Sequence, residues 1–358
     1  MISFSTRARL FLLLVLFTVL ALSPSILPVA DATQPVSPSD YKVVQKITLG
    51  GDGGWDYLTV DPDAHRLYIS RSTHVMVVDS DSGKVVGDIP NTNGVHGVAI
   101  VPELNKGFTS NGRDNTVTVF DLKTLAVAKQ IPVGKNPDAI IYDPASKLVF
   151  TCNGTSHDTT AIDPKTETVK GTIALDGRPE SAVADEKGHV YINLEDKSTI
   201  AAIDSRKLTV EARWPLGPGE EPSGLAMDRK HRRLFSGCSN KLMVVVNADD
   251  GHVVASLPIG SGVDATAFDP SSQLAFSSNG EGTLTVIHED TPDKFTVVEN
   301  VPTQRGARTM TLDPKTHKIF LDTAEFGPPP APTAERPRPR PSIVPGTFTL
   351  LVVDKSKP

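Results

Sequence analysis

Seven polar or charged residues recur along this chain of 358 residues at steps of 40 to 44 positions. They are Asp56, His96, Asp138, Glu180, Ser223, Asp264 and Arg308. Several carboxylate oxygens suit a hard cation such as calcium, whereas an imidazole nitrogen favours a transition metal. The guanidinium of Arg308 suits an anionic carboxylate or phosphate instead. If the fold brings these side chains together, they predict a charged site for a ligand or a cation.

Two interpretations of these seven residues stay open. They line a hydrated channel rim whose charges compensate one another, or they form a functional site. In an enzyme, His96 would act as a general base or metal ligand, and Arg308 would stabilise charge. The chain lacks the motifs of covalent haem attachment, zinc proteases, phosphate loops and dinucleotide binding. We therefore expect a binding scaffold without catalysis, and the alternative is a hydrolase or oxidoreductase that uses a metal or a quinone- or haem-type cofactor.

Short β-strands must position these residues. The segment from Pro137 to Arg178 holds four runs rich in β-branched and aromatic residues, separated by Asp-Pro, Asn-Gly and Asp-Gly pairs typical of tight turns. The pattern recurs, and most copies end the third run on Asp or Asn, whereas the sixth copy has His288 and Glu289 there. Because nearly every copy has this Asp or Asn, we assign it to turn formation rather than to catalysis.

A period of about 40 residues with four strands per copy is typical of a β-propeller. Seven copies predict an all-β fold of seven four-stranded antiparallel blades. The last copy lacks its fourth strand, and residues 41–50 supply a matching one, so we expect the N-terminal strand to pair into the last blade and close the ring. The seven polar residues each stand near the start of an innermost strand, which predicts that they meet at one mouth of the central channel. From the loops between second and third strands we expect five more residues there, namely Arg71, Asn111, Asn153, Glu195 and Asn279.

Short sequence motifs recur at equivalent places in the copies, among them Leu67-Tyr68-Ile69-Ser70, Phe150-Thr151-Cys152-Asn153 and Ile131-Pro132-Val133-Gly134. In these motifs the repeat resembles that of the bacterial YVTN-repeat, YncE-like β-propellers over about residues 41–354. The resemblance implies the propeller fold. It leaves function open, because such propellers serve as binding scaffolds, as parts of redox enzymes and as haem-handling proteins.

Both ends of the chain are predicted to lie outside the propeller, which we place at residues 41–354. Arg7 and Arg9 precede an apolar run from Leu10 to Leu22 and a small-residue cleavage site at Ala30-Asp31-Ala32, the pattern of a signal peptide over residues 1–32. A linker, 33–40, and a tail, 355–358, complete the division. We expect the mature chain to be periplasmic or secreted, without stable membrane insertion, and monomeric.

Composition restricts the partners. The formal net charge is −6, which argues against nucleic acid because that partner needs a basic footprint. We expect a small molecule or a protein at the channel mouth. The two cysteines, Cys152 and Cys238, fall in blades that are not neighbours, so we expect separate thiols rather than a disulfide.

One proline-rich insertion, residues 324–346, interrupts the seventh copy. Its composition predicts an extended loop, and its position places that loop at the same mouth as the seven polar residues. It is either a tolerated insertion or a basic flap, through Arg336, Arg338 and Arg340, that covers the mouth or docks a partner.

Overall fold

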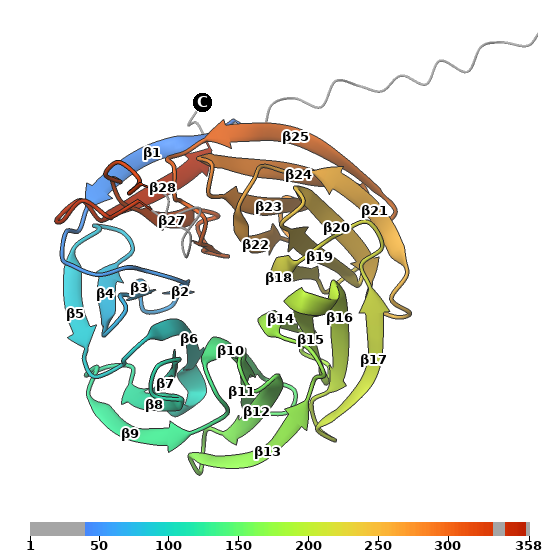
Figure 1. The fold of residues 1–358 in the computed structure, drawn as a ribbon, viewed down its shortest axis with the longest axis horizontal. Coiled ribbons are helices and arrows are strands. Elements are labelled where there is room, and N and C mark those ends of the chain that lie inside the picture. The colour runs from blue at the N-terminus through green and yellow to red at the C-terminus, as the bar shows by residue number, and fades with distance from the viewer. Residues whose placement is uncertain (1–39, 332–340, 356–358) are drawn as a thin grey trace, which may run out of the picture. The chain divides into compact units, whose positions relative to one another are not determined.

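The computed structural model describes residues 40–331 and 341–355. Figure 1 shows seven blades that follow one another round a ring in chain order. Each blade is one antiparallel four-stranded sheet, and no α-helix occurs in the described ranges. The predicted fold is therefore confirmed. The predicted signal peptide lies outside the described residues, as do the linker up to residue 39, the three residues after Lys355 and the middle of the proline-rich insertion.

The strands of the first four blades run from the innermost to the outermost in chain order. Blade one consists of β2 (Leu58–Asp61), β3 (Arg66–Ser70), β4 (Val75–Asp79) and β5 (Val85–Ile89), and blade two of β6 (Val95–Val101), β7 (Lys106–Asn111), β8 (Thr116–Asp121) and β9 (Val127–Pro132). Blade three consists of β10 (Pro137–Asp143), β11 (Leu148–Asn153), β12 (Asp158–Asp163) and β13 (Thr168–Ala174), and blade four of β14 (Pro179–Ala184), β15 (His189–Leu194), β16 (Thr199–Asp204) and β17 (Thr209–Pro215).

The remaining blades repeat this order, except that the seventh takes its outermost strand from the start of the chain. Blade five consists of β18 (Pro222–Asp228), β19 (Arg233–Cys238), β20 (Leu242–Asn247) and β21 (Val253–Pro258), and blade six of β22 (Val263–Asp269), β23 (Leu274–Asn279), β24 (Thr283–Thr291) and β25 (Lys294–Pro302). Blade seven consists of β26 (Met310–Leu312), β27 (Ile319–Thr323), β28 (Thr349–Lys355) and β1 (Tyr41–Thr48).

The ring closes as the repeat predicts. Strand β1 pairs antiparallel with β28, from Tyr41 opposite Lys355 to Thr48 opposite Thr349. The Tyr41 ring is buried and meets Phe276 of blade six edge-on, with ring centroids 5.3 Å apart. Pairing the two ends of the propeller in this way removes two unpaired strand edges, which would otherwise invite association with other chains.

Aromatic side chains of the second strands fill the space between neighbouring blades. All seven are 1% exposed or less, and they are Tyr68, Phe108, Phe150, Tyr191, Phe235, Phe276 and Phe320. The aspartates that end the third strands have the structural role assigned to them, since Asp163, for example, accepts hydrogen bonds from the backbone N–H groups of Lys165 and Thr166. Cys152 and Cys238 are both buried free thiols, as expected. Among the described residues, no helix is long and apolar enough to cross a membrane.

The innermost strands of adjacent blades approach closely where small residues follow the predicted site positions. A Cβ atom on Gly224 of β18 would lie 2.6 Å from backbone atoms of Ala265 and Thr266 in β22. A Cβ atom on Gly97 of β6 would have the Ile140 side chain as its nearest neighbour, at 3.2 Å. Backbone cannot withdraw as a side chain can, so we expect Gly224→Ala to lower the free energy of unfolding by about 3 kcal/mol and Gly97→Ala by less than about 1 kcal/mol. Urea denaturation of both variants checks this, and equal losses would contradict it.

Candidate functional site

Asp56, His96 and Asp138 form one cluster at the mouth, which we define as the end of the channel where the innermost strands begin. Asp56 precedes β2, and the other two are the second residues of β6 and β10, so three successive blades each supply one side chain. The Nδ1 atom of His96 lies 2.6 Å from an Asp56 oxygen and 3.6 Å from an Asp138 oxygen. Burial lowers the pKa of His96, but the Asp56 hydrogen bond and the charges of Asp138 and Asp56 outweigh burial and raise that pKa above its usual value. The cluster therefore favours a protonated imidazole or a bound cation.

Arg308 connects this cluster to Asp264 and Ser223. Its Nε donates to an Asp264 oxygen at 2.6 Å, and its Nη2 donates to Asp56 at 3.4 Å. The Ser223 hydroxyl donates to the other Asp264 oxygen at 2.8 Å. Burial lowers the pKa of the guanidinium, and the charges of Asp264 and Asp56 more than reverse this effect. Arg308 thus stays charged while two carboxylates hold it in place.

Among the seven residues predicted to meet at the mouth, Glu180 is the one whose charge is least compensated. No cationic side chain lies within ion-pair distance of it in the described part of the chain. Burial, with the charges of Asp138 and Asp264, raises the pKa of Glu180 to about 9. Burial is also the largest cause that raises the pKa of Asp138 to about 7. The carboxylates at the mouth therefore outnumber the cations, and Glu180 and Asp138 release their protons at higher pH than ordinary carboxyl groups.

Tyr57 lies among these carboxylates, and the sequence interpretation missed it. Its side chain comes from the first blade, yet it packs against the core cluster of blades three and four that includes Ala139 and Cys152. Burial, and the charges of four carboxylates led by Glu180, raise the pKa of its hydroxyl well above the usual value. The aligned positions hold only small side chains, namely Gly97, Ala139, Ser181, Gly224, Ala265 and Thr309. A tyrosine where every other blade has a small residue was the sequence signal that could have identified Tyr57.

The loops between second and third strands contribute less to the mouth than expected. Asn111, Asn153 and Asn279 are fully buried and donate to threonine hydroxyls of the third strands, so each joins two strands of its own blade. Arg71 is also buried, and Glu195 pairs with Arg178 at 2.6 Å. Polar side chains at strand ends are satisfied within the blade because a buried amide or guanidinium without partners would be costly.

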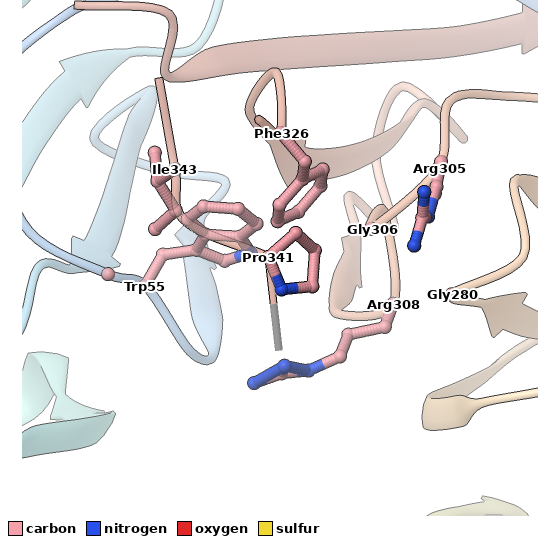
Figure 2. Close-up of a pocket in the computed structure, with 9 residues that line it drawn as sticks. Trp55, Gly280, Arg305, Gly306, Arg308, Phe326, Pro341 and Ile343 are labelled. Atoms are coloured by element: carbon pink, nitrogen blue, oxygen red, sulfur yellow. The ribbon is translucent and has the colours of Figure 1, made fainter. Parts of the chain in front are cut away.

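A pocket opens beside Arg308. It has a volume of about 330 Å³ and is lined by Gly54, Trp55, Gly280, Arg305, Gly306, Arg308, Phe326, Pro341 and Ile343. Figure 2 shows Trp55, Phe326 and Pro341 gathered on one side, with the side chains of Arg305 and Arg308 beyond them. The Trp55 ring has two sets of neighbours. It packs on Phe348, with centroids 5.5 Å apart, and it also forms part of the pocket wall.

The described flanks of the proline-rich insertion reach this pocket. Phe326 and Ile343 form an isolated β-bridge, and the Gly327 N–H donates to the Ser342 carbonyl at 2.8 Å. The two flanks are therefore paired, and each contributes an apolar side chain to the pocket wall. Arg336, Arg338 and Arg340 lie outside the described residues, so the flap hypothesis stays a prediction.

Comparison with known proteins supports the architecture. No family model matches the chain, and no curated protein matches it either. Among solved structures, the chain is similar to Kuenenia stuttgartiensis hydrazine synthase, with a TM-score of 0.68 and 17% sequence identity over 77% of this chain and 94% of that chain. At this identity the likeness shows the propeller fold alone.

Proposed function

We propose that this protein is an exported β-propeller scaffold that binds a small anionic ligand with a flat apolar body at the mouth of its channel. The composition of the pocket carries the proposal. Two arginines and a wall of aromatic and apolar side chains line it, and no carboxylate is among the lining residues. Its volume of about 330 Å³ falls within the range of small-molecule sites.

The two arginines have different tasks in this proposal. Arg305 is exposed, and no carboxylate lies within ion-pair distance of it in the described ranges. Its guanidinium carbon lies 5.9 Å from the centre of the Phe326 ring. It is therefore free to pair with an anionic group of the ligand, while Arg308, held by Asp264 and Asp56, presents a fixed positive charge at the inner edge.

Two further parts of the proposal rest on the sequence. The basic and apolar residues of segment 1–32 support export to a periplasm or beyond. The sequence motifs that recur in the blades support a place among the YVTN-repeat, YncE-like propellers. A protein partner at the same mouth is the other occupant that the charged rim would accept, and the test below separates it from a small ligand.

Two dyes of matched shape test the pocket. 1-Anilinonaphthalene-8-sulfonate carries a flat apolar body and an anion, whereas N-phenyl-1-naphthylamine carries a similar body and no charge. We expect Arg305→Met to weaken binding of the sulfonate dye about tenfold and to leave binding of the neutral dye unchanged, because one charged hydrogen bond is lost. Trp55→Leu should weaken binding of both dyes. Fluorescence titration measures both affinities, and the exposed Arg206→Met variant is the control.

Failure of either dye to bind with a stoichiometry of one would contradict the small-ligand proposal and favour a protein partner. So would a sulfonate affinity that is the same in wild type, Arg305→Met and Trp55→Leu. A sulfonate dye that binds at many sites equally in all variants reports nonspecific surface binding and has the same consequence.

A metal-dependent enzyme remains the second candidate, favoured by one observation. Donor atoms of Asp56, His96 and Asp138 all lie within 4.8 Å of one another. An imidazole with two carboxylates suits a first-row divalent ion, which would activate water or polarise a substrate. Stoichiometric metal that is lost in His96→Gln, together with turnover on lactone or phosphate-ester panels, would support this candidate.

A further inference from the structure

A second cluster of metal-ligand type lies at the opposite end of the innermost strands. Asp228 is the last residue of β18, while Ser223 at the mouth is the second, so about 17 Å of strand separates them. The Nδ1 atom of His231 lies 2.7 Å from an Asp228 oxygen and 2.9 Å from Oε1 of Glu289, which belongs to β24 of blade six. Donor atoms of the three residues lie within 4.8 Å of one another.

Burial makes this cluster unlike an ordinary surface ion pair. The side chain of Glu289 is 1% exposed and that of Asp228 is 3% exposed, whereas His231 is 21% exposed and forms the outer side. The second carboxylate oxygen of Glu289, Oε2, is buried and has no hydrogen-bond partner. Two buried carboxylates thus share one imidazole, and a carboxylate oxygen without a partner is costly in such a place.

Arg233 is the other cation that acts on Glu289. Its guanidinium, however, donates to the carbonyl oxygens of Pro292 and His231 and to the Asp293 carboxylate. It therefore does not satisfy Oε2 of Glu289.

The repeat itself requires neither His231 nor Glu289. Three positions after the turn aspartate, the other blades with this turn have Ala64, Ser146, Gly188, Ser272 and Thr316. At the position of Glu289, the other blades have Ser80, Leu122, Pro164, Ser205, Ala248 and Lys355. The histidine and the glutamate thus each occur once, in adjacent blades, and they face the same aspartate. A shared departure of this kind points to a role that the turn does not need.

A neighbouring blade shows how the fold satisfies such an aspartate without a metal. Asp185 is paired with His189 at 3.1 Å, and Arg232 supplies a guanidinium at 3.3 Å. The fixed positive charge of Arg232 would repel a metal cation at Asp185. Next to Asp228, blade six has the neutral Gln273 at the position equivalent to Arg232, and its charged neighbour is the acid Glu289.

We propose that Asp228, His231 and Glu289 bind a divalent first-row transition ion such as Zn²⁺ or Mn²⁺, in a site that joins blades five and six. The ligands are Asp228 Oδ2, His231 Nδ1 and Glu289 Oε1, and Oε2 of Glu289 is available for bidentate binding. Tetrahedral ligands at about 2.1 Å from an ion lie about 3.4 Å apart, so the Nδ1 atom needs to move only about 0.5 to 0.7 Å further from each of the two oxygens. Calcium fits less well, because it takes six to eight oxygen ligands.

The test uses Co²⁺ as a spectroscopic probe on the full chain after removal of metals with a chelator. We expect wild type to bind one Co²⁺ with visible d–d absorption that Zn²⁺ displaces, and His231→Gln and Glu289→Gln to weaken this binding by about 100-fold or more. His317→Gln is the matched control, because His317 lies 3.1 Å from the turn aspartate Asp269 without a second acid. His96→Gln controls for the cluster at the mouth. Both controls should keep the absorption.

Glu289→Gln also keeps the test independent of folding, because it has the shape of the native side chain and removes a buried charge. Zn²⁺ should raise the melting temperature of wild type and have no such effect on this variant. Absence of Co²⁺ binding in wild type would overturn the proposal, as would absorption that survives in His231→Gln. Absorption that disappears in His96→Gln alone would assign the metal to the mouth and overturn it as well.

Discussion

Replacing Arg71 with methionine is expected to lower the free energy of unfolding by about 2 to 4 kcal/mol and to weaken binding at the mouth pocket about tenfold. The Arg71 guanidinium donates to the carbonyl oxygens of Gly50, Asp52, Gly53 and Gly54 at 3.0 to 3.4 Å. Its Cζ atom also lies 3.7 Å from the centre of the Phe348 ring. One side chain thus fixes the glycine-rich segment that delivers Trp55 and Asp56 to the mouth.

The other hydrogen bonds of the segment use its N–H groups: Gly50 donates to the Phe348 carbonyl at 3.1 Å, and Gly54 donates to the Ser72 hydroxyl at 3.0 Å. Gly50, Gly51 and Gly53 have positive φ angles of 68°, 78° and 91°, which glycine adopts without strain but does not enforce. Without Arg71 its carbonyl groups lose their donor. Water can replace that donor at the exposed residues Asp52 and Gly53, and less easily at the half-buried Gly50 and Gly54. Arg71→Lys keeps the charge, but an ammonium cannot span four carbonyls as the planar fork does, so it should fall between methionine and wild type.

Urea denaturation and dye titration measure the two effects, and hydrogen exchange of residues 50–56 shows whether the segment has loosened. The exposed Arg206, which donates to the Lys187 carbonyl at 2.9 Å, provides the control variant Arg206→Met. Unchanged exchange in Arg71→Met would mean that the glycine segment holds its shape without the arginine, contrary to this interpretation.

The propeller could be read from the sequence because each blade repeats the same physical solution. The aromatic residue of each second strand and the aspartate at the first turn of six blades recur in phase, since the blades must fill the same gap and make similar turns. The same repetition located Asp56, His96 and Asp138, because equivalent positions of successive blades meet at one end of the channel.

Features that depend on departures from the repeat were harder to predict. Arg71 occupies a loop position expected at the mouth, yet it turns inward because the unusual run from Gly50 to Gly54 offers it four carbonyl groups. Phe326 and Ile343 join the pocket through an insertion that no other blade has. Tyr57 reaches across to another blade's core, a path that periodicity cannot reveal.

The acidic mouth also predicts how stability depends on pH. Burial and neighbouring acids raise the folded-state pKa of Glu180 to about 9 and that of Asp138 to about 7, whereas the unfolded chain releases these protons near pH 4 to 4.5. Between about pH 5 and pH 9 the folded protein therefore binds more protons than the unfolded chain. Since the slope of stability follows the protons bound by the unfolded state minus those bound by the folded state, the free energy of unfolding falls as pH rises through this window. His96, with its raised pKa, adds to the fall in the same direction.

Glu180→Gln should remove the largest part of this fall. A glutamine keeps the shape of the protonated carboxyl group and cannot ionise, so at pH 9 we expect the variant to be more stable than wild type by about 1 to 3 kcal/mol, and at pH 5 to be nearly equal. Urea denaturation at intervals of one pH unit measures the two curves, with Glu220→Gln, an exposed acid, as the control. Parallel curves for wild type and Glu180→Gln would show that Glu180 is already ionised at neutral pH and that its charge is compensated in solution. A converging pair below pH 6 that separates above pH 7 would establish that the mouth holds protons, which a cationic ligand or metal at Asp56, His96 and Asp138 would then have to displace.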